Sequence, residues 1–190
     1  MIPNKQPISY EEFLELDQDD DNLEFIEFID GKIYLQSAPS VIHQTVVTNL
    51  STEFGIYFKG KECRHFVAPF DVVFENNENT HRVQPDLTVI CDKNGLNENN
   101  YKGVPILVVE VLSPSTASKD YIQKMDLYMG FGVQEYWIVS PKSQTVEVFF
   151  LKEDGTYSEP IVFSKDDVVR SGVLSELEIR LSDIFPDFRR

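Results

Sequence analysis

Two short apolar segments each carry a single carboxylate where an apolar residue is expected. Residues 83–90 read Val-Gln-Pro-Asp-Leu-Thr-Val-Ile, and residues 106–111 read Ile-Leu-Val-Val-Glu-Val. Short apolar runs rich in β-branched residues are typical of buried strands. Because burying an unpaired carboxylate is costly, Asp86 and Glu110 need a compensating cation or hydrogen bonds. If the two strands are neighbours, one divalent metal ion can compensate both carboxylates.

The length and composition fit one globular domain. The chain has 190 residues, of which 42% are hydrophobic, enough to fill a core. We expect a single domain over residues 1–190, with its core at approximately 39–140. No apolar run approaches the ~20 residues that span a bilayer, and the first ten residues lack the pattern of a signal peptide. The prediction is a cytoplasmic protein with no membrane contact.

The formal net charge of −15 limits the classes of partner. Phosphate backbones bind through Lys and Arg, so an acidic protein repels nucleic acid at long range. This opposes broad, non-specific nucleic-acid binding, but it permits a nuclease with a local basic rim or with a site that a metal ion neutralises. The candidates for a basic rim are Lys59, Lys61, Arg64, Arg82, Lys119 and Lys142.

The two cysteines are expected to be reduced core residues. Cys63 and Cys91 lie in strand-like segments, and their spacing matches no metal-ligand motif. Because free cysteine behaves as a small apolar residue, core packing is favoured over a disulfide or a zinc site.

Hydrophobic periodicity and turn signals predict a mixed sheet flanked by helices. Ser9 and Glu12 have the spacing of a capping box for a helix over 10–16. Asp30-Gly31 is a hairpin signal, and apolar residues at helical spacing predict a long helix over 40–58. A further helix is expected over 117–129, beginning after Ser113-Pro114-Ser115-Thr116 and ending at a glycine. Strands are expected over 24–29, 32–36, 62–67, 70–74, 83–90, 106–111, 134–139, 145–151 and 161–163.

The helix over 117–129 places a lysine near the two carboxylates. Lys124 follows Glu110 by 14 residues and lies at the border of the apolar face, with Asp120 one turn before it. A lysine at such a border can lay its stem on the core and extend its ammonium group over the sheet edge. We therefore expect Asp86, Glu110 and Lys124 to meet.

These motifs together resemble the Uma family of restriction-endonuclease-like proteins, within the PD-(D/E)xK nuclease superfamily. The resemblance covers roughly residues 10–188. Its segments are 27–33, Pro39-Ser40 with His43, Pro85-Asp86, 110–116, Asp120 with Lys124, and 132–137. The resemblance implies an α/β (α+β) restriction-endonuclease-like core with a mixed central sheet flanked by helices, an N-terminal helix and hairpin, and a C-terminal β extension. The lysine that the superfamily usually has two residues after the glutamate is replaced by Leu112, and the resemblance assigns its role to Lys124.

The resemblance also implies a Mg²⁺-dependent endonuclease that hydrolyses DNA, with Mn²⁺ as an alternative ion and a homodimer as a plausible assembly. Asp86, Glu110 and the backbone carbonyl of Val111 would hold the metal ion. Lys124 would orient the attacking water or stabilise developing negative charge, and a pKa lowered by burial would let it act as a base.

Structural roles compete with these functional ones. Asp86 can cap the turn after Pro85, and Glu110 can form a buried ion pair with Lys124 and do nothing else. Three further residues are candidates for supporting roles: Glu27 as an additional carboxylate, His43 as a side chain that reaches the site, and Asp120 as a partner of Lys124. The alternative function is a catalytically silent interaction or regulatory module that keeps the nuclease fold and binds a protein partner.

Overall fold

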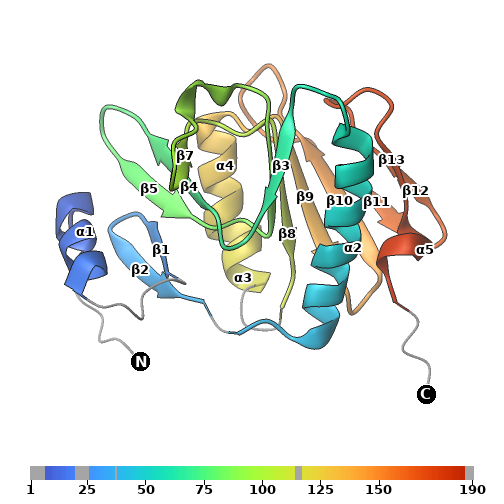
Figure 1. Cartoon of the computed structure of the whole chain (residues 1–190), viewed down its shortest axis with the longest axis horizontal. Coiled ribbons are helices and arrows are strands. Elements are labelled where there is room, and N and C mark those ends of the chain that lie inside the picture. Colours follow the sequence, from blue (N-terminus) through green and yellow to red (C-terminus); the bar gives the residue numbers. More distant parts are fainter. Residues whose placement is uncertain (1–6, 20–25, 37, 114–116, 187–190) are drawn as a thin grey trace.

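The computed structural model describes residues 7–19, 26–36, 38–113 and 117–186, in which two mixed sheets pack together (Figure 1). The five-stranded sheet has the order β2-β1-β5-β4-β7, and the six-stranded sheet has the order β11-β10-β9-β8-β6-β3. The strands of the first sheet are β1 (Ile26–Ile29), β2 (Lys32–Leu35), β4 (Asp71–Glu75), β5 (Thr80–Val83) and β7 (Asn100–Lys102). Those of the second are β3 (Arg64–Val67), β6 (Leu87–Ile90), β8 (Leu107–Val111), β9 (Glu135–Ser140), β10 (Thr145–Phe150) and β11 (Ile161–Ser164).

Both sheets are mixed because each contains one parallel pair among antiparallel ones. The parallel pairs are β4 with β7 and β8 with β9. A separate ribbon of β12 (Val168–Arg170) and β13 (Glu178–Arg180) forms the C-terminal β extension. The helical segments are α1 (Tyr10–Asp19), α2 (Val41–Phe58), a 3-10 turn (Lys93–Gly95), α3 (Ala117–Lys119), a π-helical turn (Asp120–Lys124), α4 (Met125–Phe131) and α5 (Leu181–Ile184).

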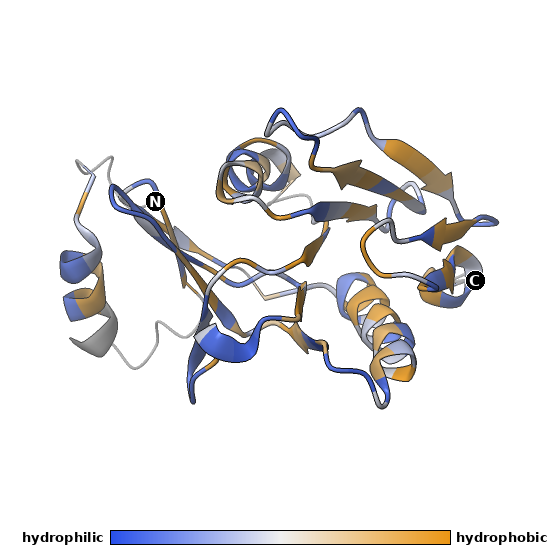
Figure 2. Cartoon of the chain, turned by 90° about the horizontal axis from the view of Figure 1, so that it is seen from above, coloured by the Kyte–Doolittle hydropathy of each residue, from blue (hydrophilic) through white to orange (hydrophobic). Residues whose placement is uncertain are grey.

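The six-stranded sheet separates two hydrophobic cores. Successive side chains of a strand point to opposite faces, so Val109 of β8 and Trp137 of β9 pack with α2 and the C-terminal extension. Val108 and Tyr136 instead pack with α4 and the five-stranded sheet. Figure 2 shows apolar residues along the strands and along α2. Glu110 follows Val109 and therefore points to the face that α4 and the five-stranded sheet cover.

The N-terminal helix and the hairpin after it form as their local sequence signals predict. The capping box forms, because the Ser9 backbone nitrogen donates to Glu12 Oε2 at 2.8 Å and the Glu12 backbone nitrogen donates to Ser9 Oγ at 3.1 Å. Asp30 and Gly31 have positive φ angles of 50° and 72°, which allow the tight turn between β1 and β2. The predicted class, a mixed α/β (α+β) architecture, is confirmed.

The prediction of one strand over 83–90 is wrong. β5 ends at Val83 and β6 begins at Leu87, and these strands belong to different sheets. The link between them contains Pro85, which has no backbone N–H to donate to a ladder. Asp86 therefore lies where the chain passes from one sheet to the other.

The predicted helix over 117–129 and the loop after β6 also differ from the structure. The helix runs to Phe131 and is interrupted by the π-helical turn at Asp120–Lys124, while the loop over 93–103 contains β7. The helix-starting residues 114–116, residues 24–25 of the first predicted strand, and residues 187–188 lie outside the described residues.

The prediction of two reduced cysteines is wrong as well, because Cys63 and Cys91 form a disulfide. β3 and β6 pair antiparallel with Arg64 opposite Ile90. The next pair in that register is Cys63 opposite Cys91, with Cα atoms 4.1 Å apart. The strand pairing brings the two thiols together, and the sequence spacing alone does not reveal it. In the part of the chain that is described, no helix combines the length and apolarity needed to cross a membrane.

Candidate active site

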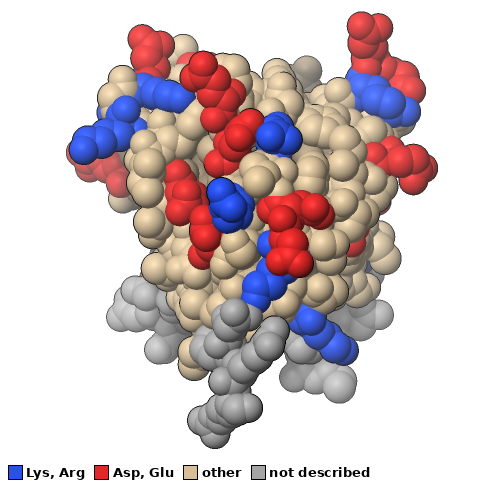
Figure 3. Space-filling view, turned by 90° about the vertical axis from the view of Figure 1, so that its right-hand side faces the viewer, with Lys and Arg blue, Asp and Glu red and all other residues tan. Residues whose placement is uncertain are grey.

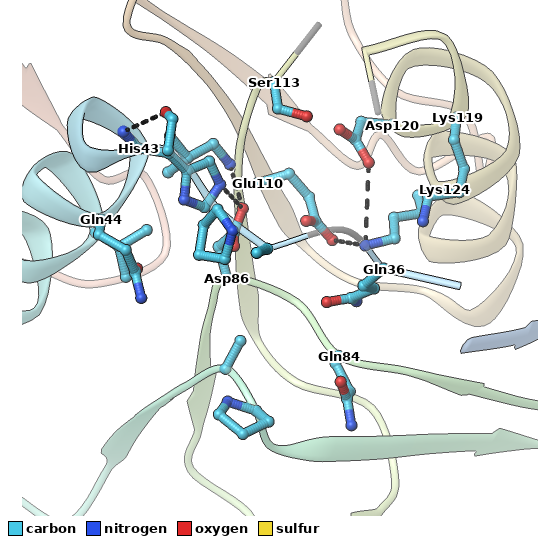
Figure 4. A pocket seen from close by; sticks show the side chains of 17 residues that line it. Gln36, His43, Gln44, Gln84, Asp86, Glu110, Ser113, Lys119, Asp120 and Lys124 are labelled. Carbon is cyan, nitrogen blue, oxygen red and sulfur yellow. Dashed lines mark hydrogen bonds and ion pairs between the residues drawn. The ribbon is translucent and has the colours of Figure 1, made fainter. Parts of the chain in front are cut away.

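A cavity of about 560 Å³ lies where the two sheets, α2 and the π-helical turn meet. Asp86 reaches it from the link between β5 and β6, and Glu110 reaches it from β8 (Figure 4). His43 enters from the first turn of α2, and Lys124 enters from the π-helical turn. The structure therefore brings together the three residues predicted to meet, from segments far apart in the sequence.

Asp86 is held by a backbone amide and a histidine. The Val111 backbone nitrogen donates to Asp86 Oδ2 at 2.7 Å, and His43 Nε2 lies 3.3 Å from the same oxygen. Ser40 caps α2 and its Oγ accepts from the His43 backbone nitrogen at 3.2 Å, which fixes the start of the helix. Burial lowers the pKa of His43, but the Asp86 carboxylate and the Val111 carbonyl outweigh it and raise that pKa overall.

Glu110 and Lys124 form a buried ion pair. Lys124 Nζ lies 2.7 Å from Glu110 Oε1, and Tyr128 Oη donates to the same oxygen at 2.7 Å. Only 3% of Glu110 and 2% of Lys124 is exposed, so Lys124 is a core residue and not the border lysine that the sequence predicts. Burial lowers the pKa of Lys124, but Glu110, Glu27 and Asp120 outweigh it and hold that pKa well above its ordinary value. Lys124 is therefore a fixed cation, which does not support the suggestion that burial lets it act as a base.

Glu27 supplies the second partner of Lys124. Its Oε1 lies 2.8 Å from Lys124 Nζ, and its Oε2 accepts from Lys119 Nζ at 2.5 Å. Burial raises the pKa of Glu27, but Lys124 and Lys119 outweigh it and lower that pKa to about 2. Glu27 belongs to β1 of the five-stranded sheet, so Lys124 joins the two sheets across the core.

Glu110 is the carboxylate of this cluster that takes up a proton most readily. Burial raises the pKa of Glu110 to about 8, with the charges of Asp120, Asp86 and Glu27 adding to the effect and Lys124 opposing it. Four carboxylates share two lysine ammonium groups, so one carboxylate gains from a proton or a further cation. The carboxylates are Asp86, Glu110, Asp120 and Glu27, and the lysines are Lys119 and Lys124.

The π-helical turn directs Asp120 and Lys124 inward together. Both residues are buried, and Asp120 Oδ1 lies 3.9 Å from Lys124 Nζ. Tyr136 Oη donates to the backbone oxygen of Asp120 at 3.1 Å. Single π turns inside helices occur often at functional sites. Asp120 is thus part of the cluster and does not face solvent.

The oxygen donors of the site fit a hard divalent cation. Among the described residues, every side-chain contact of Asp86 goes to its Oδ2 and every side-chain hydrogen bond of Glu110 goes to its Oε1, which leaves one oxygen of each carboxylate without a protein partner. Because the N–H and C=O groups of one strand residue point to the same side, the Val111 carbonyl faces the same edge as its amide. Mg²⁺ prefers such oxygen ligands and keeps several waters. Among the described residues, no three His, Cys, Asp or Glu side chains are already grouped to hold an ion.

Tyr128 is not among the site residues that the sequence predicts, and Lys119 is predicted only as part of a basic rim. The one sequence signal that links Tyr128 to Glu110 is its spacing of four residues from Lys124. Lys119 is the one candidate for a basic rim that lines the cavity among the described residues, and Glu27 already pairs with it. Arg82 is buried beside Asp71 at 3.5 Å. Figure 3 shows acidic and basic side chains interspersed on the face at the right of Figure 1.

Comparison with known proteins assigns the family. The Uma2 family, described as "Putative restriction endonuclease", matches residues 10–182. The chain belongs to the Uma2 family. Two proteins of Synechocystis sp. are similar to this Uma2 chain. The uncharacterised protein slr1290 is 32% identical over 132 residues, covering 69% of this chain and 68% of the relative. The uncharacterised protein sll1609 is 28% identical over 135 residues, covering 70% and 75%.

A solved structure shares the fold of this Uma2 chain. It is the crystal structure of a protein from Anabaena variabilis that is titled a putative nuclease belonging to DUF820. The TM-score is 0.76 at 24% sequence identity, and the match covers 94% of this chain and 98% of the other. The predicted family is confirmed, and the solved structure supports the predicted restriction-endonuclease-like fold.

Proposed function

We propose that this protein is a Mg²⁺-dependent endonuclease that hydrolyses phosphodiester bonds in DNA, with Mn²⁺ as an alternative ion. One observation carries the proposal: Asp86 and Glu110 both line one cavity, each with one carboxylate oxygen that has no partner among the described residues, and the Lys124 ammonium group lies 2.7 Å from Glu110. The membership in a family of restriction endonucleases supports the same class of reaction.

The residues of the cavity would have different roles in such a reaction. Asp86, Glu110 and the Val111 carbonyl would hold the ion. Bound Mg²⁺ would polarise the phosphate and lower the pKa of a water molecule. Lys124 remains protonated, so it donates hydrogen bonds and offsets negative charge.

Other residues of the cluster orient these groups. His43 fixes one oxygen of Asp86, and Glu27 keeps Lys124 in place from the opposite sheet. Tyr128 fixes the glutamate by donating to Glu110 Oε1. These contacts fix the Asp86 and Glu110 carboxylates in the wall of the cavity.

One observation favours the alternative of a catalytically silent module that binds a protein partner. Lys124 already compensates Glu110, and His43 already contacts Asp86, so the described cluster is largely satisfied by protein groups. Buried ion pairs of this kind also occur in cores with no catalytic role. The two functions are distinguished by supplying a divalent ion and DNA together. The endonuclease would cleave the DNA, and the silent module would not.

Nicking of supercoiled plasmid by the purified protein tests the proposal. We expect nicking with Mg²⁺ or Mn²⁺ and none with EDTA. Asp86→Asn, Glu110→Gln and Lys124→Met should each lower the rate at least about 100-fold, as for loss of a group that stabilises the transition state. Glu178→Gln is the matched control, because Glu178 is exposed and pairs only with Arg170 among the described residues. Wild-type protein that never nicks, or nicking that survives all three substitutions, would favour the silent module.

A homodimer stays a prediction. Many soluble oligomers are two-fold dimers, and two copies would let two sites act on two strands. Light scattering on the eluting peak of a size-exclusion column measures the mass directly. A mass of twice the 21.9 kDa chain would support the dimer, and a mass of one chain would contradict it.

A further inference from the structure

One wall of the cavity and the hollow beside it carry no charged side chains, which bears on the form of DNA that the site accepts. Between Lys32 and Glu53, residues 33–52 contain no Asp, Glu, Lys or Arg, although 26% of the chain is charged. This stretch supplies Gln36, Ser40 and Gln44 to the wall of the cavity. This side of the site is therefore neither acidic, as the net charge would suggest, nor basic, as duplex binding would favour, and the charged residues line the other walls of the cavity.

A second hollow continues the cavity along α2. It has a volume of about 420 Å³ and shares Pro39, Ser40 and Gln44 with the first cavity. It is further lined by Thr45 and Thr48. Both Gln44 and Thr48 are exposed, and neither side chain hydrogen-bonds to another described residue. This second hollow has no charged lining residue and presents the amide of Gln44 and the hydroxyl of Thr48, and we call it the α2 groove.

The reactive groups lie deep in this cavity. Glu110 is 3% exposed, and 18% of the Asp86 side chain is exposed. A duplex is stiff and presents about one negative charge per 1.7 Å of axis, which binding proteins usually offset with Lys and Arg. The two lysines of the wall, Lys119 and Lys124, are both paired with carboxylates. A relaxed, rigid duplex thus finds neither the access nor the uncompensated cations that it requires, whereas a supercoiled plasmid exposes transiently unpaired segments.

We propose that the substrate of this site is an unpaired DNA strand, which enters the cavity and runs out along the α2 groove. This inference rests on the proposed function and adds its substrate class. A single strand is flexible and less densely charged, so it can bring a phosphate to a recessed carboxylate. The cavity volume of about 560 Å³ lies in the range of pockets that enclose small molecules. Its apolar wall, including Pro39 and Val47, can lie against a base, and the amides of Gln36 and Gln44 in the cavity lining can hydrogen-bond to polar atoms of the strand.

The test compares one labelled oligonucleotide alone and annealed to its complement. Binding is measured by fluorescence anisotropy in EDTA, and cleavage is measured with Mg²⁺. We expect the single strand to bind at least about tenfold more tightly than the duplex and to be cleaved faster. If the duplex binds equally or more tightly and is cleaved faster, the inference about the single strand is overturned. The proposed nuclease function would still stand.

Matched variants locate the strand on the protein. Thr48→Glu places a negative charge in the α2 groove, and single-strand binding should weaken about fivefold. Thr52→Glu is the control, because Thr52 is also exposed on α2 but lines neither hollow. Equal effects of the two substitutions would contradict the path along α2.

The failure of the inference is distinguishable from the failure of the nuclease. If single strands bind preferentially but are not cleaved, the result would support strand binding in the α2 groove and contradict the proposed hydrolysis. If neither form of DNA binds or is cleaved, both proposals fall. Circular dichroism of both Glu variants shows that any loss is not a loss of folding.

Discussion

The ammonium nitrogen of Lys124 lies 2.7 Å from Oε1 of Glu110, between a π-helical turn and a central strand. Both side chains are almost fully buried. A buried charge with its partner removed is much more costly than a buried pair. The contact therefore ties the chemistry of the site to the stability of the fold.

Replacing Lys124 with methionine should strongly destabilise the protein without metal. Lys124→Met leaves Glu110 and Glu27 without their shared cation, and we expect a loss of about 3–5 kcal/mol in the free energy of unfolding. Urea denaturation in EDTA measures it. Lys152→Met, in an exposed pair with Asp154, should change that free energy by no more than about 0.5 kcal/mol. A similar small change for both variants would contradict the role of Lys124.

Stability without metal should depend on pH through Glu110. The pKa of Glu110 is raised to about 8 in the folded protein from an ordinary value of 4.5. The folded state therefore holds a proton that the unfolded state releases, so this contribution is full below pH 4.5 and is lost as the pH rises to about 8. The pKa of His43 is also raised, so its deprotonation lowers the free energy of unfolding further as the pH rises.

Glu110→Gln separates the two contributions to this pH dependence. Urea denaturation in EDTA, from pH 5 to pH 9, measures the free energy of unfolding of wild type and of Glu110→Gln. This free energy should fall more steeply with pH for wild type. Because protons and Mg²⁺ compete for the same carboxylate, Mg²⁺ should raise the wild-type melting temperature more at pH 9 than at pH 6. Parallel pH profiles for the two proteins would refute the assignment to Glu110.

Acid should destabilise the protein through Glu27. The pKa of Glu27 is lowered to about 2, so its contribution is present above the ordinary value of 4.5 and is lost as the pH falls toward 2. Comparison of wild type with Glu27→Gln between pH 5 and pH 2 measures this loss. Wild type should approach the stability of the variant at the acid end, and a constant difference would argue against the ion pairs of Glu27.

Glu135 should matter for stability and not for the reaction. It accepts hydrogen bonds from Trp137 Nε1 at 2.5 Å, from Ser171 Oγ at 2.9 Å and from the backbone nitrogens of Gly172 and Val173. Glu135→Ala leaves these donors unpaired, and we expect a loss of about 3 kcal/mol in the free energy of unfolding.

The cleavage rate per folded molecule of Glu135→Ala should equal that of wild type. Thermal unfolding gives the stability change, and plasmid nicking below the transition gives the rate. Since Glu135 does not line the cavity, a lost rate in a protein that is still folded would show that the C-terminal extension participates in the site.

The disulfide between Cys63 and Cys91 should stabilise the edge of the six-stranded sheet. It joins β3 to β6 across a sequence separation of 28 residues, a loop length for which the expected contribution is about 3 kcal/mol. Cys63→Ser should lower the free energy of unfolding by that amount in oxidising buffer, and excess dithiothreitol should abolish the difference. Two thiols that react with Ellman's reagent in the oxidised native protein would contradict the bond.

The sequence predicts local structure well where one short signal decides it. The Asp30-Gly31 turn and the helix capped by Ser40 need only their own residues, and both form where predicted. The strand over 83–90 is different, because its apolar character continues across Pro85 while the chain changes sheets. Periodicity cannot report which sheet a strand joins.

The sequence predicts only part of the site, because the partners of each site residue depend on tertiary packing. A buried carboxylate in an apolar strand marks Glu110, but Glu135 satisfies the same criterion and serves a structural role. What distinguishes them is their partners: donors from residues 137–173 surround Glu135, whereas Glu110 keeps one oxygen uncommitted. Those partners depend on tertiary packing. The inward direction of Lys124 depends on a π-helical turn that no local signal announces.

Binding of Mn²⁺ to the protein, followed by electron paramagnetic resonance, tests most directly whether Asp86 and Glu110 form a metal site. The free-ion signal should fall as wild-type protein is added, with a dissociation constant at least tenfold lower than for Asp86→Asn or Glu110→Gln, as expected when one carboxylate ligand is lost. Glu178→Gln should bind like wild type. Equal Mn²⁺ binding by all four proteins would contradict the account.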